Sequence, residues 1–193
     1  MKIVSGRVGC QEENASMLNA TSDVKRCLVL WTAIFLSSGA VHAGQDHSSA
    51  KFTSKEGAFS VALPETPKEK SQEISSKTGP STLHTFLVER NEGRSFFLVG
   101  YSDYQVPLDV KSSLEGVISG QVEGMKGKIT SDKMVTLDGH PGRSVTIEAE
   151  GNVFFSSVYI VGNRLYQIMY GMPQAEAMPS DAREFFDSFR ILL

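Results

Sequence analysis

The chain has 193 residues, and 19 lysines and arginines against 22 aspartates and glutamates give a formal net charge of −3. This balance gives no basic surface for a polyanion, so we expect no nucleic-acid partner. Both cysteines, Cys10 and Cys27, lie in the first 43 residues. A chain that has lost this part has neither a disulfide nor a thiol nucleophile.

The segment ending at Ala43 is organised like a secretory signal. A basic pair at 25–26 precedes ten mostly apolar residues, 27–36, and small residues follow up to Ala43. The apolar run is about half of the ~20 residues that a membrane-spanning helix needs. A buried core helix is the alternative, but it does not explain the abrupt change to the polar stretch "GQDHSSAKF". We therefore expect cleavage between Ala43 and Gly44, and a periplasmic or secreted protein without a stable membrane span.

The signal starts late in the chain. Counted from Met1 it would have 43 residues, but counted from Met17 it would have 27, within the usual range of about 15–30. We therefore expect translation to begin at Met17, with residues 1–16 an artefact of the gene model. No cysteine follows Ala43, so a lipid anchor on an N-terminal cysteine is not expected.

Cleavage would leave residues 44–193, a length typical of one domain. We expect 44–51 to be a disordered N-terminus and 52–193 to form a single α+β domain. Its first predicted strands lie in 52–63, on either side of a turn at 55–57 and ended by Pro64. Residues 81–90 and 94–104 then flank Asn-Glu-Gly, which indicates a hairpin.

A three-stranded antiparallel meander is predicted over 143–150, 153–161 and 164–171. In the first of these strands apolar and polar residues alternate, so we expect one face to be buried and the other to be exposed to solvent. Gly-Asn pairs at 151–152 and 162–163 separate the three runs. Such pairs favour tight turns that need a positive φ angle.

Two helices are predicted. One spans 108–125, where apolar residues recur at helical spacing: Val110, Leu114, Val117, Ile118, Val122 and Met125. The other begins near Pro179, which suits a first helical turn, and carries Ala182, Phe185, Phe186 and Phe189 on one face. The tail "RILL" is expected to add a short strand. Hairpins with helices packed on them give an α+β class, an antiparallel sheet packed between helices.

Several phrases together resemble the PsbP-like family: "EGAFSVALPETPKE", "VGYSDY", "LDGHPGRSVTIEAEG", "VYIVGNRLYQIMYG" and "FFDSFRI". This family includes the extrinsic protein of plant photosystem II and many exported bacterial proteins. The resemblance covers nearly all of 52–191. It implies an α/β/α sandwich and a binding or assembly role rather than an enzyme, and it transfers no functional residue because no site motif matches.

Catalytic motifs are missing from the sequence. It has no phosphate-binding Gly-x-x-x-x-Gly-Lys-Ser/Thr loop and no Gly-x-Ser-x-Gly elbow, and the histidines after residue 43 (His47, His84 and His140) lie far apart. We expect no catalytic residue, metal or cofactor. The alternative is a small exported hydrolase using His84, His140 and Asp103, which requires these groups to converge in one pocket.

Two groups of residues are candidates for contact with a partner. Gly116, Gly120 and Gly124 form a row largely away from the apolar stripe of the first helix, and a smooth glycine row permits close approach of another backbone. A helix that is simply weak is the alternative.

Tyr101, Asp103 and Tyr104, with His140 in the turn "DGHPG", form the second candidate, a recognition patch on loops. The alternative places Tyr101 in the core, Asp103 as an organiser of its loop and His140 in solvent. We expect an exported, non-enzymatic binding or accessory module of the periplasm or cell envelope, acting on an unknown envelope or membrane protein. A hydrolase and an inhibitor or immunity-type protein are the alternatives.

Overall fold

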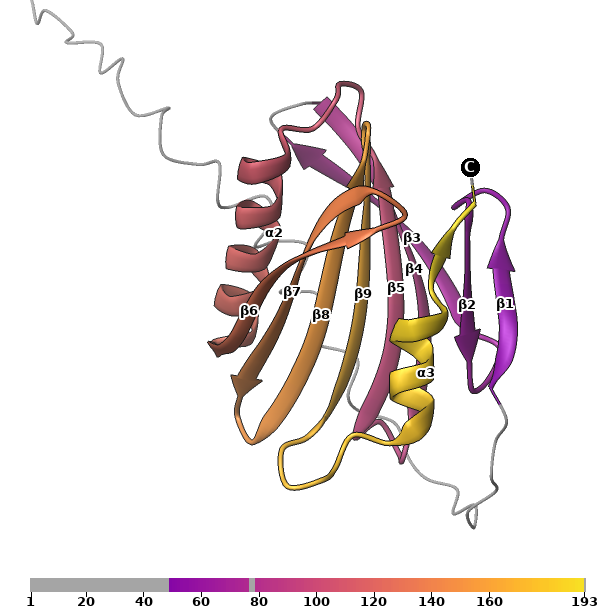
Figure 1. The fold of residues 1–193 in the computed structure, drawn as a ribbon, viewed down its shortest axis with the longest axis vertical. Coiled ribbons are helices and arrows are strands. Elements are labelled where there is room, and N and C mark those ends of the chain that lie inside the picture. Colours follow the sequence, from indigo (N-terminus) through magenta and orange to yellow (C-terminus); the bar gives the residue numbers. More distant parts are fainter. Residues whose placement is uncertain (1–48, 77–78, 193) are drawn as a thin grey trace, which may run out of the picture.

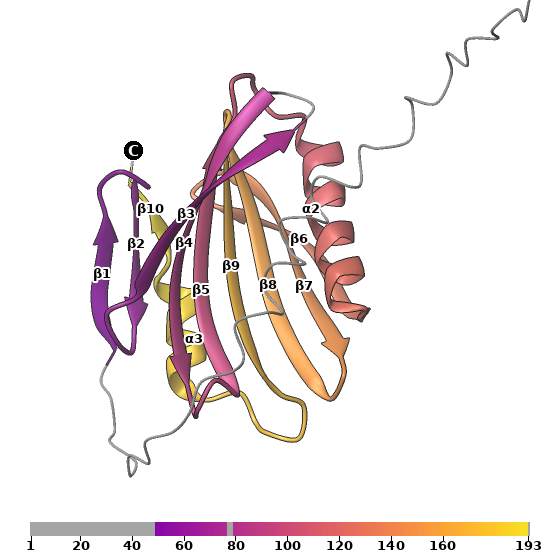
Figure 2. The ribbon, with the colours of Figure 1, turned by 180° about the vertical axis from the view of Figure 1, so that it is seen from behind.

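The computed structural model describes residues 49–76 and 79–192 (Figures 1 and 2). The predicted signal and residues 44–48 lie outside the described residues. The described elements are β1 (Ala50–Ser54), β2 (Phe59–Leu63), β3 (Lys68–Ser76), β4 (Gly79–Arg90), β5 (Ser95–Asp103), α2 (Val110–Met125), β6 (Lys128–Leu137), β7 (His140–Ala149), β8 (Asn152–Val161), β9 (Arg164–Pro173), α3 (Ser180–Ser188) and β10 (Arg190–Ile191).

The strands form two antiparallel sheets. The larger has seven strands in the order β3-β4-β5-β9-β8-β7-β6, and the smaller has three in the order β1-β2-β10. Within the larger sheet β6 to β9 form a continuous meander whose last strand returns to pair with β5, so the chain crosses from β5 to β6 through α2. The meander predicted for 143–171 is confirmed as β7, β8 and β9.

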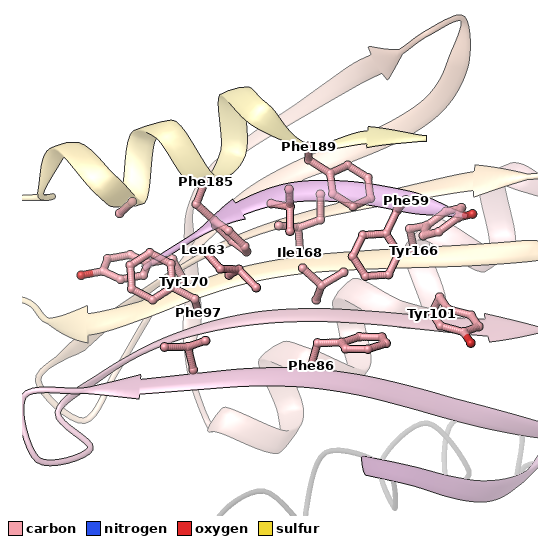
Figure 3. Packing of buried hydrophobic residues seen from close by; sticks show 14 of the residues in the cluster. Phe59, Leu63, Phe86, Phe97, Tyr101, Tyr166, Ile168, Tyr170, Phe185 and Phe189 are labelled. Carbon is pink, nitrogen blue, oxygen red and sulfur yellow. The ribbon is translucent and has the colours of Figure 1, made fainter. Parts of the chain in front are cut away.

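One face of the large sheet is covered by α3 and the small sheet (Figure 3). Aromatic rings dominate this core, and Phe59 is at its centre, with rings of Phe86 and Phe189 at 5.3 and 5.7 Å between centroids. From α3, the ring of Phe185 packs edge-on against that of Phe97 at 5.4 Å. The aromatic face predicted for this helix is therefore confirmed.

Part of the opposite face, at β7 and β8, is covered by α2 (Figure 2). Leu114 and Ile118 are buried there against apolar side chains of these strands, among them Val145 and Val158. The helix begins at Asp109, whose carboxylate accepts a hydrogen bond from the Ser112 amide at 2.9 Å, as an N-cap residue does.

The fold is therefore antiparallel α+β and mostly sheet. We expected a sheet packed between helices. In the structure, one face of the large sheet packs against a short helix together with a second, small sheet. The strands β3 and β6 were not predicted. Both are edge strands with largely exposed side chains, so neither has the alternation that burial of one face imposes.

The N-terminal boundary also differs from the expectation. Ala50 and Lys51, expected to be disordered, pair with Leu63 and Ala62 as the start of β1. The ladder with β2 supplies their backbone hydrogen bonds, which a local polar composition does not reveal.

Candidate functional site

Three of the four predicted loop residues, Tyr101, Asp103 and Tyr104, lie at one end of the large sheet, where β5 ends and β9 begins. The fourth, His140, begins β7, which is three strands from β5. The strand register places Tyr101 beside His84 of β4 and Tyr166 of β9, and it places Asp103 beside Arg164. The β1–β2 turn lies over this end, because the Tyr166 hydroxyl donates a hydrogen bond to the Gly57 carbonyl at 2.8 Å.

Asp103 and Arg164 form a two-pronged ion pair across β5 and β9. Arg164 Nε and Nη2 each donate to one Asp103 carboxylate oxygen at 2.6 Å, and Nη1 donates to the Glu56 carbonyl at 3.1 Å. The hydrogen bonds to Asp103 are the main cause that holds the pKa of Arg164 above its usual range. Three chain segments are thus joined by one guanidinium group.

Tyr101 lies beneath this ion pair and is 1% exposed. The Arg164 guanidinium carbon is 4.9 Å from the Tyr101 ring centroid, and the His84 ring stacks on the same tyrosine at 4.6 Å and 7°. Burial, followed by the charge of Glu56, raises the pKa of Tyr101 to about 12. Tyr101 is a core residue, so it does not form part of an exposed recognition patch.

The loop after β5 is fixed to the β8–β9 turn. The Tyr104 amide donates to the Asn163 carbonyl at 2.9 Å, the Asn163 side-chain amide donates to the Tyr104 carbonyl at 2.7 Å, and the Leu108 amide donates to the Gly162 carbonyl at 3.2 Å. Between these anchors Val106 is 45% exposed. The loop is therefore held in shape while it presents an apolar side chain to solvent.

We call this region the turn-end surface. Its exposed residues come from the β1–β2 turn, the end of β5 with the following loop, and the β8–β9 turn: Lys55, Glu56, Asp103, Gln105, Val106, Pro107, Gly162 and Asn163. Sequence reasoning identified Asp103 but missed Arg164, Val106 and Asn163. The pairing of Arg164 with Asp103 needs the β5–β9 register, and these two strands are separated by the whole of α2 and β6 to β8.

The two histidines of the hydrolase alternative do not converge. The strand order places β4, which carries His84, four strands from β7, which carries His140, a separation of roughly 19 Å at about 4.8 Å per strand. His84 is also engaged locally, with its Nδ1 2.9 Å from the Ser71 hydroxyl. The third member, Asp103, is bound to Arg164.

No group of three or more His, Cys, Asp or Glu side chains within 49–76 and 79–192 is placed to hold a metal ion. Among the helices of the same residues, none has the length and apolar character needed to cross a bilayer.

The three candidate glycines of α2 have different surroundings. Gly116 is exposed, Gly120 is buried and Gly124 is half-buried. A row of residues four apart turns by about 40° per step around an α-helix, so the row that begins in solvent drifts towards the sheet. The expected smooth outer face is thus limited to Gly116, around which an added methyl group would meet nothing within 4 Å.

Comparison with known proteins gives a likeness of fold. No protein-family model matches the chain, and no curated protein matches it. The chain is similar to the solution structure of cyanobacterial PsbP (CyanoP) from Synechocystis sp. PCC 6803, with a TM-score of 0.49 and 8% identity over 79% of this chain and 98% of that one.

A crystal structure from Bacteroides thetaiotaomicron VPI-5482 has a TM-score of 0.40 and 14% identity, over 75% of this chain and 48% of that one. The first of these two structures is a PsbP protein, the family that the phrases of the sequence resemble. At these identities the likeness concerns the fold alone, so the function proposed below is argued from the chain's own residues.

Proposed function

We propose that this chain is an exported, non-enzymatic binding or accessory module with a PsbP-like α/β/α architecture, and that it contacts a protein partner through the turn-end surface. The observation that carries the proposal is the loop at 104–108, which presents Val106 between three hydrogen bonds to the β8–β9 turn. A loop already fixed in shape loses little conformational entropy on binding. Loops positioned by a rigid sheet are also common places for recognition.

The export part of the proposal rests on the basic, apolar and small-residue order that ends at Ala43. The non-enzymatic part is supported by the separation of His84 from His140 and by the existing partners of His84 and Asp103. An inhibitor or immunity-type role would use the same surface, so the nature of the captured partner distinguishes it from an envelope accessory.

Site-specific photocrosslinking tests the partner surface. The full-length chain is expressed in its native host with a photoreactive residue at position 105 or, as the matched control, at exposed position 184 on α3. We expect one discrete protein adduct from position 105 and none from position 184. In the position-105 chain, Val106→Asp should remove the adduct without changing the thermal unfolding midpoint. Equal adducts from both positions, or none from position 105, would refute the proposed surface.

A further inference from the structure

Two unpartnered polar groups are buried in the layer between α2 and the large sheet. The Gln121 side chain is 0% exposed, and neither its amide nitrogen nor its oxygen has a hydrogen-bond partner among the described residues. The Ser156 hydroxyl, on a residue that is 1% exposed, is also without one. Leaving such groups unpaired costs about 1–3 kcal/mol each, so each calls for a physical explanation.

Both groups point into the same layer. Gln121 follows Leu114 by seven residues, which returns it to within about 20° of the sheet-facing direction of α2. Ser156 pairs with Val145 on β7 and shares its face of β8 with Phe154 and Val158, since side chains two apart along a strand lie on one face. All four apolar residues belong to the cluster between α2 and the sheet.

The two groups also lie at a similar position along the length of the strands. Gly127, just after the end of α2, lies close to β7, because a methyl group added to it would be 2.9 Å from the Glu148 carbonyl oxygen. Glu148 pairs with Val153 on β8, so the end of α2 lies next to the part of β8 that contains Phe154. From there Gln121 lies about 9 Å back along the helix, at 1.5 Å per residue. Ser156 lies about 7 Å from Phe154 along its strand, and α2 contacts both β7 and β8.

One flank of α2 carries two of its glycines, of which Gly120 is buried and Gly124 is half-buried. Asp132 is the main cause of the raised pKa of Arg143 on β7, and the charge of Glu115 contributes, so Glu115 marks the flank of α2 turned towards β7 and β6. Measured as rotation about the helix axis from Leu114, Glu115 lies at about +100°, whereas Gly120 and Gly124 lie at about −120° and −80°. The two glycines are therefore on the opposite flank of α2, which is turned towards β9. On β9, Met169 is directly opposite Ser156 and is buried.

We propose that α2 and the sheet enclose a binding site for a small uncharged molecule with a primary amide or hydroxyl group, which hydrogen-bonds to Gln121 and Ser156. The ligand must both donate and accept, because the Gln121 amide offers one group of each kind. It must be uncharged, because the two groups that would bind it are neutral and almost fully buried, and an unpaired buried ion is costly.

Hexanamide is the probe, and hexanoate, with the same chain and a charged head, is the matched control. Residues 44–193 are titrated to about 10 mM, because so small a ligand binds with roughly millimolar affinity. We expect hexanamide to raise the unfolding midpoint and to shift the Gln121 side-chain amide resonance saturably, and hexanoate to do neither. The resonance is assigned from its loss in Gln121→Leu.

The variants separate a ligand site from a buried polar defect. Gln121→Leu should raise the unfolding midpoint of the free protein by several degrees, because an unpaired amide is removed, and should weaken hexanamide binding by about tenfold or more. Ser156→Ala is the milder second variant and should weaken binding in the same direction. Gln174→Leu, in an exposed loop, should bind like the parent chain.

The proposal is overturned if hexanamide gives no saturable response, which would leave an internal water as the partner of Gln121. It is also overturned if Gln121→Leu and Ser156→Ala bind hexanamide as the parent chain does. None of these outcomes depends on the turn-end surface, so the two proposals succeed or fail separately.

Discussion

Arg164 joins three segments that are far apart in the sequence, the β1–β2 turn, the end of β5 and the start of β9. Its hydrogen bonds to Asp103 and to the Glu56 carbonyl lie over the ring of Tyr101. Because the ion pair is partly exposed, its net contribution to stability is modest, about 1 kcal/mol or less. Its importance is that it fixes where the turns lie, and therefore the shape of the turn-end surface.

Tyr101 should make the protein sensitive to alkaline pH. Burial raises its pKa to about 12 in the folded chain, against about 10 when unfolded. The phenol is neutral in both states below pH 10, so its contribution to stability is fully present there and is lost as the pH rises from 10 to 12. Urea unfolding across this range should show Tyr101→Phe losing less stability than the parent chain.

Tyr159 and Tyr170 provide the control for this experiment. Burial is the main cause that raises the pKa of each of them as well, so Tyr101→Phe should reduce the alkaline loss without abolishing it. An unchanged loss in this variant would mean that Tyr101 ionises as easily in the folded chain as in the unfolded one.

The helix α2 contains a glycine without a structural reason, whereas β7 contains one that packing requires. Gly116→Ala should stabilise the protein by about 0.5–1 kcal/mol, because a helix-interior glycine is replaced in open space. Gly142→Ala should destabilise it, because the added methyl group would lie 2.6 Å from the Val158 carbonyl. Urea unfolding of both variants measures the contrast. A destabilised Gly116→Ala would indicate that this face of the helix does have a neighbour.

The two sheets are held together mainly by aromatic packing, so the molecule should be most sensitive at their junction. Phe59 on β2 is fully buried and packs against rings from β4, β5, β9 and the segment after α3. Phe59→Ala should cost about 3–5 kcal/mol, as large-to-small changes at buried aromatics do. Half-buried Phe52 on β1 is the control. A loss at Phe59 no greater than at Phe52 would contradict the central role of this ring.

The location of the whole molecule is the prediction with the widest consequences. If the segment ending at Ala43 is a secretory signal, mass spectrometry of the native protein should find a chain that begins at Gly44 in the periplasmic or secreted fraction. Replacing the basic pair at 25–26 by glutamates should retain the precursor inside the cell. A native protein found in the cytosol with residues 27–36 still attached would remove the export proposal.

Local pattern was sufficient for the meander and for α3. In β7 one face is buried and the other is partly exposed, and the phenylalanines of α3 recur at helical spacing, so burial left a periodic signal in the sequence. It was insufficient for β3 and β6, whose exposed edge positions place no such demand on their residues.

Only the packed molecule decides what the candidate residues do. The sequence places Tyr101 near a loop, but strand pairing buries it between His84 and Arg164, which are 17 and 63 positions away. Likewise, the drift of the α2 glycines towards the sheet depends on how the helix is rotated against β7 and β8. Periodicity depends on residues that are close together along the chain. A site depends on residues from distant segments, which come into contact only when the strands pair in the folded protein.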